Sequence, residues 1–225
     1  MKNSPISVIV CTLNEEKYIK NCLTRLKAQK IVPEIIVVDG HSKDNTIKIA
    51  KKYADKIVYD NKDGISDARN VGWKKASAKI VAFCDCDSRP DPDWTEKIIK
   101  NMKDNIAISG PLISYDGTKS MKKKFRVWTD FFPRFAKKIG YNCIWGANMA
   151  FKKSSLKKYP FELKFLEDFY MSKRLRKTKK VSFVKSLKLP VSSRRFTSGF
   201  HRACFKYYVI GGLKIVLGIK TKGYY

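Results

Sequence analysis

The sequence predicts an α/β protein: a mostly parallel sheet with helices on both faces, followed by a basic helical extension at the C-terminus. Two observations carry this prediction. Short apolar runs rich in Val and Ile alternate with stretches of helical periodicity through the first half of the 225-residue chain. These runs contain few polar positions, which is typical of strands that are buried on both faces.

The expected strands of the first half are apolar runs of four to six residues, too short for typical helices. They are residues 6–11, 34–38, 56–59, 80–84 and 106–109. Helices are expected between them, at residues 15–29, from Asp44 or Asn45 onward, at 66–76 and at 92–102. In the first helix apolar residues recur at helical spacing, and we expect Asn14 to cap its N-terminus.

The second half is less regular. An amphipathic helical segment is expected at residues 121–138, a turn into a short strand at 144–151, and a helix with an acidic start at 165–177. Two further strands are expected at 181–183 and 187–190. Residues 203–219 are apolar but interrupted by lysines and a Gly pair, so they predict an interfacial or docked helix rather than a membrane span.

The positive charge belongs mainly to the second half. Of the net charge of +28, residues 1–104 carry +5 and residues 105–225 carry +23. Residues 171–188 hold eight Lys or Arg and no acid. Such a surface favours an anionic membrane or another polyanion, while a solvated Lys-rich surface is the alternative. Charge alone does not exclude nucleic acid.

The cysteines and the N-terminus bear on the compartment. The six cysteines form no CxxC pair and no regular framework, which favours a reduced, cytosolic protein. The first apolar run is short and is followed directly by acidic residues, unlike a signal peptide.

Polar residues follow three of the predicted strands. Thr12, Asp39, Asp85 and Asp87 stand at or just after strand ends, and the carboxyl ends of parallel strands meet at one edge of a sheet. Asp85 and Asp87 are separated by a single residue, which is a poor arrangement for two like charges unless a cation lies between them. A solvated strand end is the alternative. The sequence therefore predicts a ligand site at this edge.

Five stretches resemble glycosyltransferase family 2, in the order in which that family carries them. They are "ISVIVCTLNEEKYI", "IIVVDGHSKDNT", "GISDARNVGWKKASAKIVAFCDCDSRPDPDW", "GANMAF" and "FLEDF". The resemblance implies the GT-A fold, a Rossmann-like sheet, and inverting sugar transfer from a nucleotide sugar. We therefore expect a GT-A domain at 1–200, with a nucleotide-binding half at 1–104 and an acceptor half at 105–200. The apolar pattern near the C-terminus adds a separate amphipathic segment at 201–225.

For the nucleotide, the resemblance implies that Thr12, Asn14 and Glu15 lie near base and ribose. Asp39 would read the base edge, since a carboxylate accepts from a donor such as uracil N3–H. A turn-forming cap is the alternative role for Asp39. Two departures, Gly40 where many members carry Asp and His41 where Gly is common, leave base selectivity open.

For the diphosphate, the resemblance implies that Asp67 and Arg69 lie beside it, a guanidinium being suited to phosphate oxygens. "DCD" resembles the DxD motif, so Asp87 is expected to bind Mn²⁺ or Mg²⁺ directly. Asp85 is expected at the metal or at the ribose. The resemblance also implies a C-terminal arginine over the diphosphate, which is Arg194 or Arg195.

For the transfer step, Asp168 resembles the general base of the family's ED motif, and Gly146 and Ala147 would line the sugar pocket. Glu167 fits a helix N-terminus, which is also the alternative role for Asp168. Asn70 and Gly72 are expected to serve helix packing.

The sequence thus predicts a metal-dependent inverting glycosyltransferase with a UDP- or GDP-linked donor and a glycan or lipid-linked acceptor hydroxyl. A polyprenyl phosphate acceptor is the main alternative. Nucleotidyl transfer is less favoured, because "CTLNEE" is acidic where a phosphate loop would be basic. Non-catalytic nucleic-acid binding is less favoured, because it would not need the carboxylates Asp39, Asp85, Asp87 and Asp168 together. No nucleic-acid partner is expected. The expected location is cytoplasmic, peripheral on the cytoplasmic face of a membrane.

Overall fold

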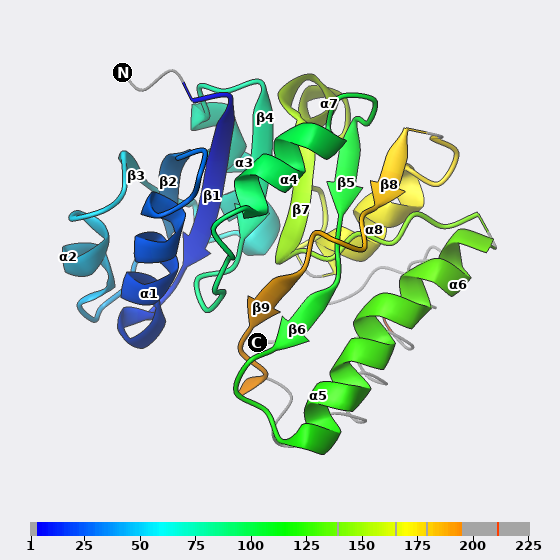
Figure 1. Cartoon of the computed structure of the whole chain (residues 1–225). Helices are drawn as coiled ribbons and strands as arrows, with labels where there is room; N and C mark the ends of the chain where they lie inside the picture. The colour runs from blue at the N-terminus through cyan, green and yellow to red at the C-terminus, as the bar shows by residue number, and fades with distance from the viewer. Residues whose placement is uncertain (1–3, 139, 165, 179, 195–210, 212–225) are drawn as a thin grey trace.

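The computed structural model describes residues 4–138, 140–164, 166–178, 180–194 and 211 (Figure 1). In this part of the chain the main sheet has seven strands in the order β3-β2-β1-β4-β7-β5-β8. Its strands are β1 (Ile6–Thr12), β2 (Glu34–Asp39), β3 (Lys56–Tyr59), β4 (Ile80–Cys84), β5 (Ala107–Ser109), β7 (Asn148–Lys152) and β8 (Val181–Phe183). Strands β3, β4 and β8 have the predicted bounds, and the others differ from prediction by a few residues at most.

The sheet is mostly parallel, as predicted. β1 pairs in parallel with β2 and β4, β2 with β3, and β5 with β8, while β7 runs antiparallel between β4 and β5. The parallel strands β1, β2 and β4 therefore end at one edge of the sheet, where the sequence predicts the ligand site.

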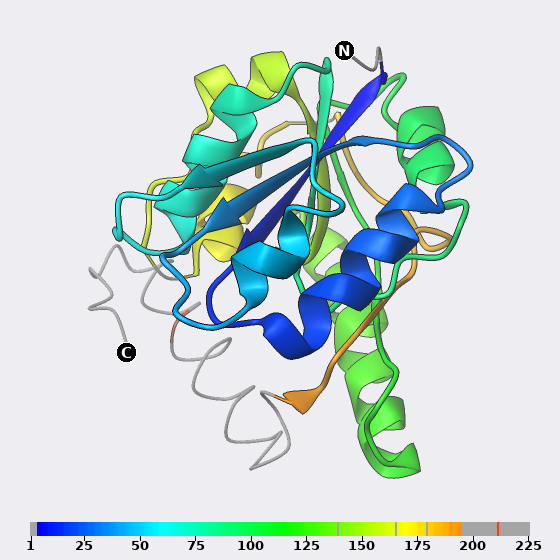
Figure 2. The ribbon, with the colours of Figure 1, turned by 90° about the vertical axis from the view of Figure 1, so that its left-hand side faces the viewer.

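Helices cover both faces of the sheet (Figures 1 and 2). Their bounds are α1 (Glu16–Lys27), α2 (Thr46–Ala50), α3 (Ile65–Lys75), α4 (Trp94–Asn101), α7 (Lys153–Lys158) and α8 (Glu167–Arg174). Side chains of α1, α2 and α4 share one buried cluster with Val8 and Val10 of β1. Side chains of α3, α7 and α8 share a second cluster with Ile9. The alternation along β1 thus builds two cores, and most of the driving force for folding comes from burying them.

The contact between α3 and the sheet requires a glycine. A Cβ at Gly72 would lie 2.4 Å from Ile9 Cγ2 and 2.9 Å from Val38 Cγ2, so any larger residue would push the helix off β1 and β2. Asn70, on the same helix, donates from Nδ2 to the Phe161 carbonyl at 2.7 Å and accepts from the Phe161 N–H at 3.1 Å. The packing roles expected for Asn70 and Gly72 are confirmed.

The predicted Asn14 cap is wrong. Helix α1 has Glu15 at its N-cap position, with no side-chain cap bond. Asn14 has a positive φ of 54°, and its Oδ1 instead accepts from the Lys43 N–H at 2.8 Å. Asn14 therefore joins the loop after β1 to the loop after β2, a long-range contact that helix-capping statistics cannot anticipate.

A smaller unit lies beyond the main sheet (Figure 1). It has the two parallel strands β6 (Leu112–Ser114) and β9 (Leu189–Val191), and a helical segment made of α5 (Lys119–Arg126), the π-helical η1 (Val127–Phe131) and α6 (Phe132–Lys138). The helical segment was predicted, whereas β6 and α7 were not. Residues 203–219 lie outside the described residues except for Gly211. Among the helices that are described, none is long and apolar enough to cross a bilayer.

Candidate active site

Strand pairing brings the predicted polar residues to one edge. Thr12 stands opposite Asp39 in the register of β1 and β2, and β1 also pairs with β4, which leads directly into Asp85. Thr12 is buried, and its Oγ1 donates to Cys86 Sγ at 3.7 Å. The loop after β1 is therefore linked to the loop after β4.

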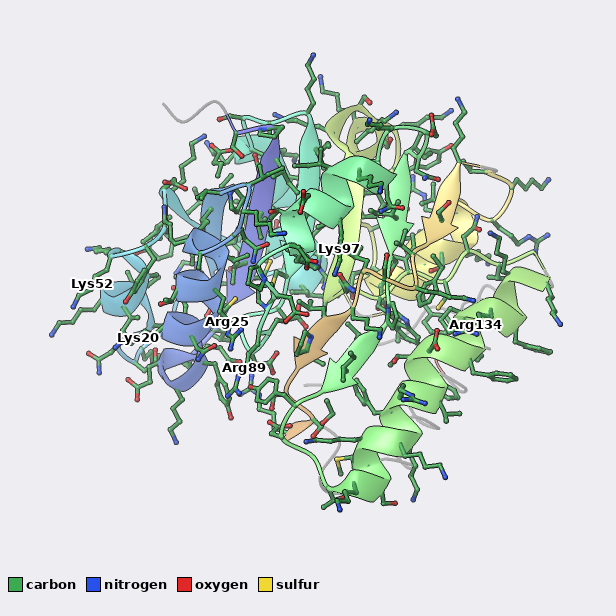
Figure 3. The ribbon with its side chains drawn as sticks, in the orientation of Figure 1. Lys20, Arg25, Lys52, Arg89, Lys97 and Arg134 are labelled. Atoms are coloured by element: carbon green, nitrogen blue, oxygen red, sulfur yellow. The ribbon has the colours of Figure 1, made fainter. Side chains whose placement is uncertain are left out.

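The loop after β4 is a tight turn that exposes its two carboxylates to different extents. The Ser88 N–H donates to the Asp85 carbonyl at 3.0 Å, and Cys86 between the carboxylates is buried. The side chain of Asp85 is 40% exposed, whereas that of Asp87 is 10% exposed. Arg89, which follows Ser88 in this loop, lies beside β9, where its N–H donates to the Pro190 carbonyl at 2.7 Å (Figure 3).

The guanidinium of Arg194 contacts the carboxylate of Asp87. Arg194 Nε donates to Asp87 Oδ2 at 3.0 Å, and its Nη2 donates to Glu15 Oε1. The guanidinium also stacks 4.3 Å from the centre of the Tyr18 ring. Although burial opposes the charged form, the carboxylates of Glu15 and Asp87 hold the pKa of Arg194 well above its ordinary value.

The carboxylates of Asp85 and Asp87 are the candidate ligands of a divalent cation. Asp87 and Glu15 pair with a cationic side chain in the structure, and Asp85, in the same loop as Asp87, presents a partly exposed carboxylate, so this loop offers the hard oxygens that Mg²⁺ and Mn²⁺ prefer. Among the described residues no group of three or more His, Cys, Asp or Glu is arranged to hold a metal by itself. Two carboxylates are enough where phosphate oxygens complete the shell.

The side chain of Asp39 is fully buried and engaged as a cap. Its Oδ2 accepts from the Ser42 N–H at 2.8 Å and its Oδ1 accepts from Ser42 Oγ at 2.5 Å. Ser42 Oγ in turn accepts from the Asn14 N–H at 2.8 Å. The turn-forming role that we considered for Asp39 is therefore present, and base recognition by Asp39 stays a prediction.

Asp67 and Arg69 lie on α3 but face different surroundings. Asp67 accepts from the Asn61 N–H at 2.6 Å and from Asn61 Nδ2 at 2.9 Å, so both of its oxygens hold the loop after β3. Arg69 is 4% exposed and forms an ion pair with Glu167 at the start of α8. The placement of Asp67 and Arg69 beside a diphosphate stays a prediction.

Arg69 also lies close to Asp85 and to Gly146. Its Nη2 is 3.9 Å from Asp85 Oδ1, and a Cβ on Gly146 would lie 2.6 Å from the same nitrogen. Gly146 therefore lets the guanidinium pass directly beneath the backbone that carries the predicted sugar pocket. The next residue, Ala147, is buried.

Asp168 is held by two backbone donors. Its Oδ2 accepts from the Gly146 N–H at 3.0 Å and its Oδ1 accepts from the Phe169 N–H at 2.8 Å, which fixes the carboxylate at the N-terminus of α8. Burial raises the pKa of Asp168, although the Arg69 charge and the two N–H donors act in the opposite direction. A carboxylate with a raised pKa is a better proton acceptor than an ordinary one.

Sequence reasoning missed Asp60, Tyr18 and Ser42. Asp60 directly follows β3, has a side chain that is 10% exposed, and accepts from the Lys62 N–H at 3.0 Å. It obeys the same strand-end rule that identified Asp39 and Asp85, so the sequence contained a signal for it. The stacking of Tyr18 on Arg194 and the bonds of Ser42 to Asp39 depend on long-range or loop geometry. Arg195 lies outside the described residues.

Residues 7–160 match the family model described as glycosyl transferase family 2. The chain belongs to this family. The putative glycosyltransferase EpsH of Bacillus subtilis is 32% identical over 110 residues, which cover 46% of this chain and 32% of EpsH. The chain spans about a third of the length of this curated relative.

Two solved structures support the GT-A fold. The mannosyltransferase PcManGT from Pyrobaculum calidifontis, in complex with GDP-Man and Mn²⁺, has a TM-score of 0.76 at 18% identity, covering 97% of this chain and 66% of its own. The glucosyl-3-phosphoglycerate synthase from Mycobacterium tuberculosis, in complex with Mn²⁺, UDP and glucosyl-3-phosphoglycerate, has a TM-score of 0.69 at 20% identity, covering 98% of this chain and 82% of its own. This family 2 chain therefore has the expected mostly parallel GT-A sheet with helices on both sides.

Proposed function

We propose that this family 2 chain is a metal-dependent inverting glycosyltransferase that moves a sugar from a nucleotide sugar to a hydroxyl of a glycan or lipid-linked acceptor. The observation that carries the proposal is the bridge made by Arg69, whose guanidinium contacts Asp85 of the DxD motif and pairs with Glu167 of the ED motif. Together with the bond from the Gly146 N–H to Asp168, this bridge supports a single site for donor binding and acceptor activation.

On the donor side, Asp87 and Asp85 would hold Mn²⁺ or Mg²⁺. When bound, this ion would neutralise the diphosphate and stabilise it as a leaving group. Thr12, Asn14, Glu15 and Asp39 would surround base and ribose. The GDP-Man and the UDP that are bound in the two structural neighbours support a UDP- or GDP-linked donor here.

On the acceptor side, Asp168 would take the proton of the attacking hydroxyl. The acceptor oxygen forms its bond to the anomeric carbon, the bond from that carbon to the diphosphate oxygen breaks, and its electron pair leaves with the nucleoside diphosphate. Attack from the opposite face inverts the configuration. The raised pKa of Asp168 supports this role, because it makes the carboxylate more basic.

Residues 1–104 would form the donor half and residues 105–200 the acceptor half, and we propose peripheral attachment to the cytoplasmic face of an anionic membrane. The excess of Lys and Arg in the second half supports an anionic lipid nearby. The same charge favours the alternative acceptor, a polyprenyl phosphate, which needs no base. Family membership disfavours nucleotidyl transfer and nucleic-acid binding.

A screen of UDP- and GDP-sugars with Mn²⁺ tests the proposal, read as a rise in melting temperature and as release of nucleoside diphosphate. We expect one donor class to stabilise the protein more than any other and more than an oligonucleotide does. Stabilisation by nucleic acid alone, with no response to any nucleotide sugar, would overturn it.

A further inference from the structure

The helical segment α5-η1-α6 stands at the side of the main sheet and extends beyond it (Figures 1 and 2). One face of the segment packs inward, with Phe125, Thr129 and Ala136 between 2% and 5% exposed. Thr129 Oγ1 donates to the Leu112 carbonyl at 2.7 Å, and Trp145 Nε1 donates to the Thr129 carbonyl at 3.1 Å. The segment is therefore anchored to β6 and to the predicted sugar pocket, and its orientation is fixed.

The opposite side, here called the outer face, is defined by Val127, Phe131 and Phe135. These side chains are 55%, 66% and 52% exposed and follow one another at intervals of four residues, so they line up along the helical segment. Only two other large apolar side chains in the described part of the chain, Leu13 and Tyr59, are exposed to a similar extent. Three large apolar groups along one helix face are typical of a surface that meets an apolar partner.

Positive charge surrounds the outer face. Residues 119–138 contain eight Lys or Arg and a single acid, Asp130. Arg134 on α6 (Figure 3) donates from Nε to that acid at 3.2 Å and so offsets it. The other basic residues of the segment are exposed: Lys119, Lys122, Lys123, Lys124, Arg126, Lys137 and Lys138. An apolar stripe with Lys and Arg at its borders is the pattern of a helix that lies in a membrane interface.

We propose that the outer face is the membrane-docking element of this protein and binds the surface of an anionic bilayer, with Phe131 and Phe135 inserted between headgroups. A second copy of the chain would bring a net charge of +28 against the same lysines, and nucleic acid would leave the phenylalanines in water. An anionic bilayer satisfies both the charge and the apolar stripe. The inference deepens the membrane attachment proposed above and does not depend on the transfer chemistry.

The placement also suits a lipid-linked acceptor. In Figure 1, β1 runs downward toward the end of the molecule at which α5 lies, so the carboxyl edge of the sheet and the helical segment share that end. The bond between Trp145 and Thr129 joins the segment to the residue just before Gly146. Docking of the outer face would therefore bring the bilayer near the site without any rearrangement of the sheet.

The test is co-sedimentation of the full chain with vesicles of phosphatidylcholine alone and with added phosphatidylglycerol. We expect wild type to bind only the anionic vesicles at low salt and to be released at high salt. The double variant Phe131→Ser/Phe135→Ser should bind at least about fivefold more weakly, because two apolar anchors are lost. Tyr59→Ser, which removes an equally exposed aromatic ring elsewhere, is the matched control and should bind as wild type does.

Charge is tested in the same assay. Lys122→Gln/Lys123→Gln should weaken binding more than Lys51→Gln/Lys52→Gln, an equally exposed pair just after α2. The emission of Phe131→Trp should shift to shorter wavelength with anionic vesicles only. Equal binding of the serine variant and wild type, equal binding to both kinds of vesicle, or no vesicle binding would each overturn the proposal. Donor-induced stabilisation, measured without lipid, separates these outcomes from a failure of the proposed transfer function.

Discussion

Arg194 Nε donates to Asp87 Oδ2 at 3.0 Å, although 107 positions separate the two residues in the sequence. The guanidinium reaches Asp87 and Glu15 together and so places one positive charge where we propose a divalent cation. Arg194 can therefore compensate the charge of these carboxylates before metal and diphosphate bind. It would turn to the diphosphate afterwards, because a guanidinium suits phosphate oxygens as well as carboxylate oxygens.

Asp87→Ala should remove metal-dependent transfer. The phosphates of the donor lose the cation that Asp87 would hold, so we expect turnover to fall by about 10²–10³-fold and nucleoside diphosphate to bind more weakly. Transfer assays and calorimetric titration with UDP and Mn²⁺ measure both effects. EDTA should reproduce the loss in wild type, with Mn²⁺ or Mg²⁺ restoring activity. Full turnover by metal-stripped wild type would contradict the metal assignment.

Arg194→Gln should separate the two roles of this guanidinium. Without the competing charge, Mn²⁺ alone should bind about two- to fivefold more tightly, the order expected for removing one partly exposed ion pair. The donor KM should instead rise by about tenfold, because a charged contact to the diphosphate is lost. Arg25→Gln on α1 (Figure 3), whose Nε donates to Asn21, is the matched control. Unchanged affinity for Mn²⁺ would show that Arg194 does not compete with the metal.

Asp168→Asn should affect chemistry more than binding. The amide oxygen can still accept from one of the two backbone N–H groups, but it cannot take a proton. Turnover should therefore fall by roughly 10²–10⁴-fold while donor affinity changes little. Single-turnover kinetics and donor titration measure the two quantities. Undiminished turnover would indicate an acceptor that is already an anion, such as a polyprenyl phosphate, or a different base.

The acid limb of the pH profile should lie above the range of an ordinary aspartate. Burial raises the pKa of Asp168 from 3.8, and only the ionised carboxylate accepts a proton, so kcat/KM should rise with pH through the raised value. Between 3.8 and the raised pKa, Asp168 binds more protons in the folded state than in the unfolded state. Its contribution to stability therefore decreases as pH rises through this range. A profile that titrates near 3.8 would contradict the assignment.

The sequence was sufficient for most of the sheet because its strands are short runs of Val, Ile and Phe bounded by turn residues. It was not sufficient for β6, which has three residues and exists through its pairing with β9 some 77 positions later. Helix α7 is six residues long and carries too few apolar positions for a periodic signal. In both cases tertiary contacts decide the local structure.

In the candidate site, too, the sequence predicted some features and could not predict others. The strand-end rule and the motif resemblance predicted the carboxylates at the end of β2 and after β4. Neither could show that Arg69 is buried against Glu167, or that both oxygens of Asp67 are taken by Asn61. These pairings depend on how α3 packs against α8 and on the loop after β3. Residue type and spacing therefore predicted which polar groups gather at this edge of the sheet better than they predicted the partners of those groups.

Glu34 offers a prediction about stability that is independent of activity. This buried carboxylate at the start of β2 accepts from Ser7 Oγ at 2.5 Å, from the Ser77 N–H and Ser77 Oγ at 2.8 Å each, and pairs with Lys56 Nζ at 2.8 Å. It thereby joins β1, β2, β3 and the segment after α3. Burial alone would raise the pKa of Glu34, but these donors lower it to about 2.

The lowered pKa fixes the sign of the pH dependence. The stability contributed by the ionised Glu34 is fully present above the ordinary value of 4.5 and is lost as pH falls toward about 2, because the folded state resists protonation there. Glu34→Gln should lower the free energy of unfolding at pH 7 by about 1–3 kcal/mol and flatten its decline below pH 4.5. Urea unfolding of both proteins across this range measures the effect. Glu96→Gln, whose side chain is 52% exposed, is the control and should stay within about 0.5 kcal/mol of wild type. A variant as stable as wild type at pH 7, with the same acid-side decline, would show that the Glu34 network contributes nothing to the fold.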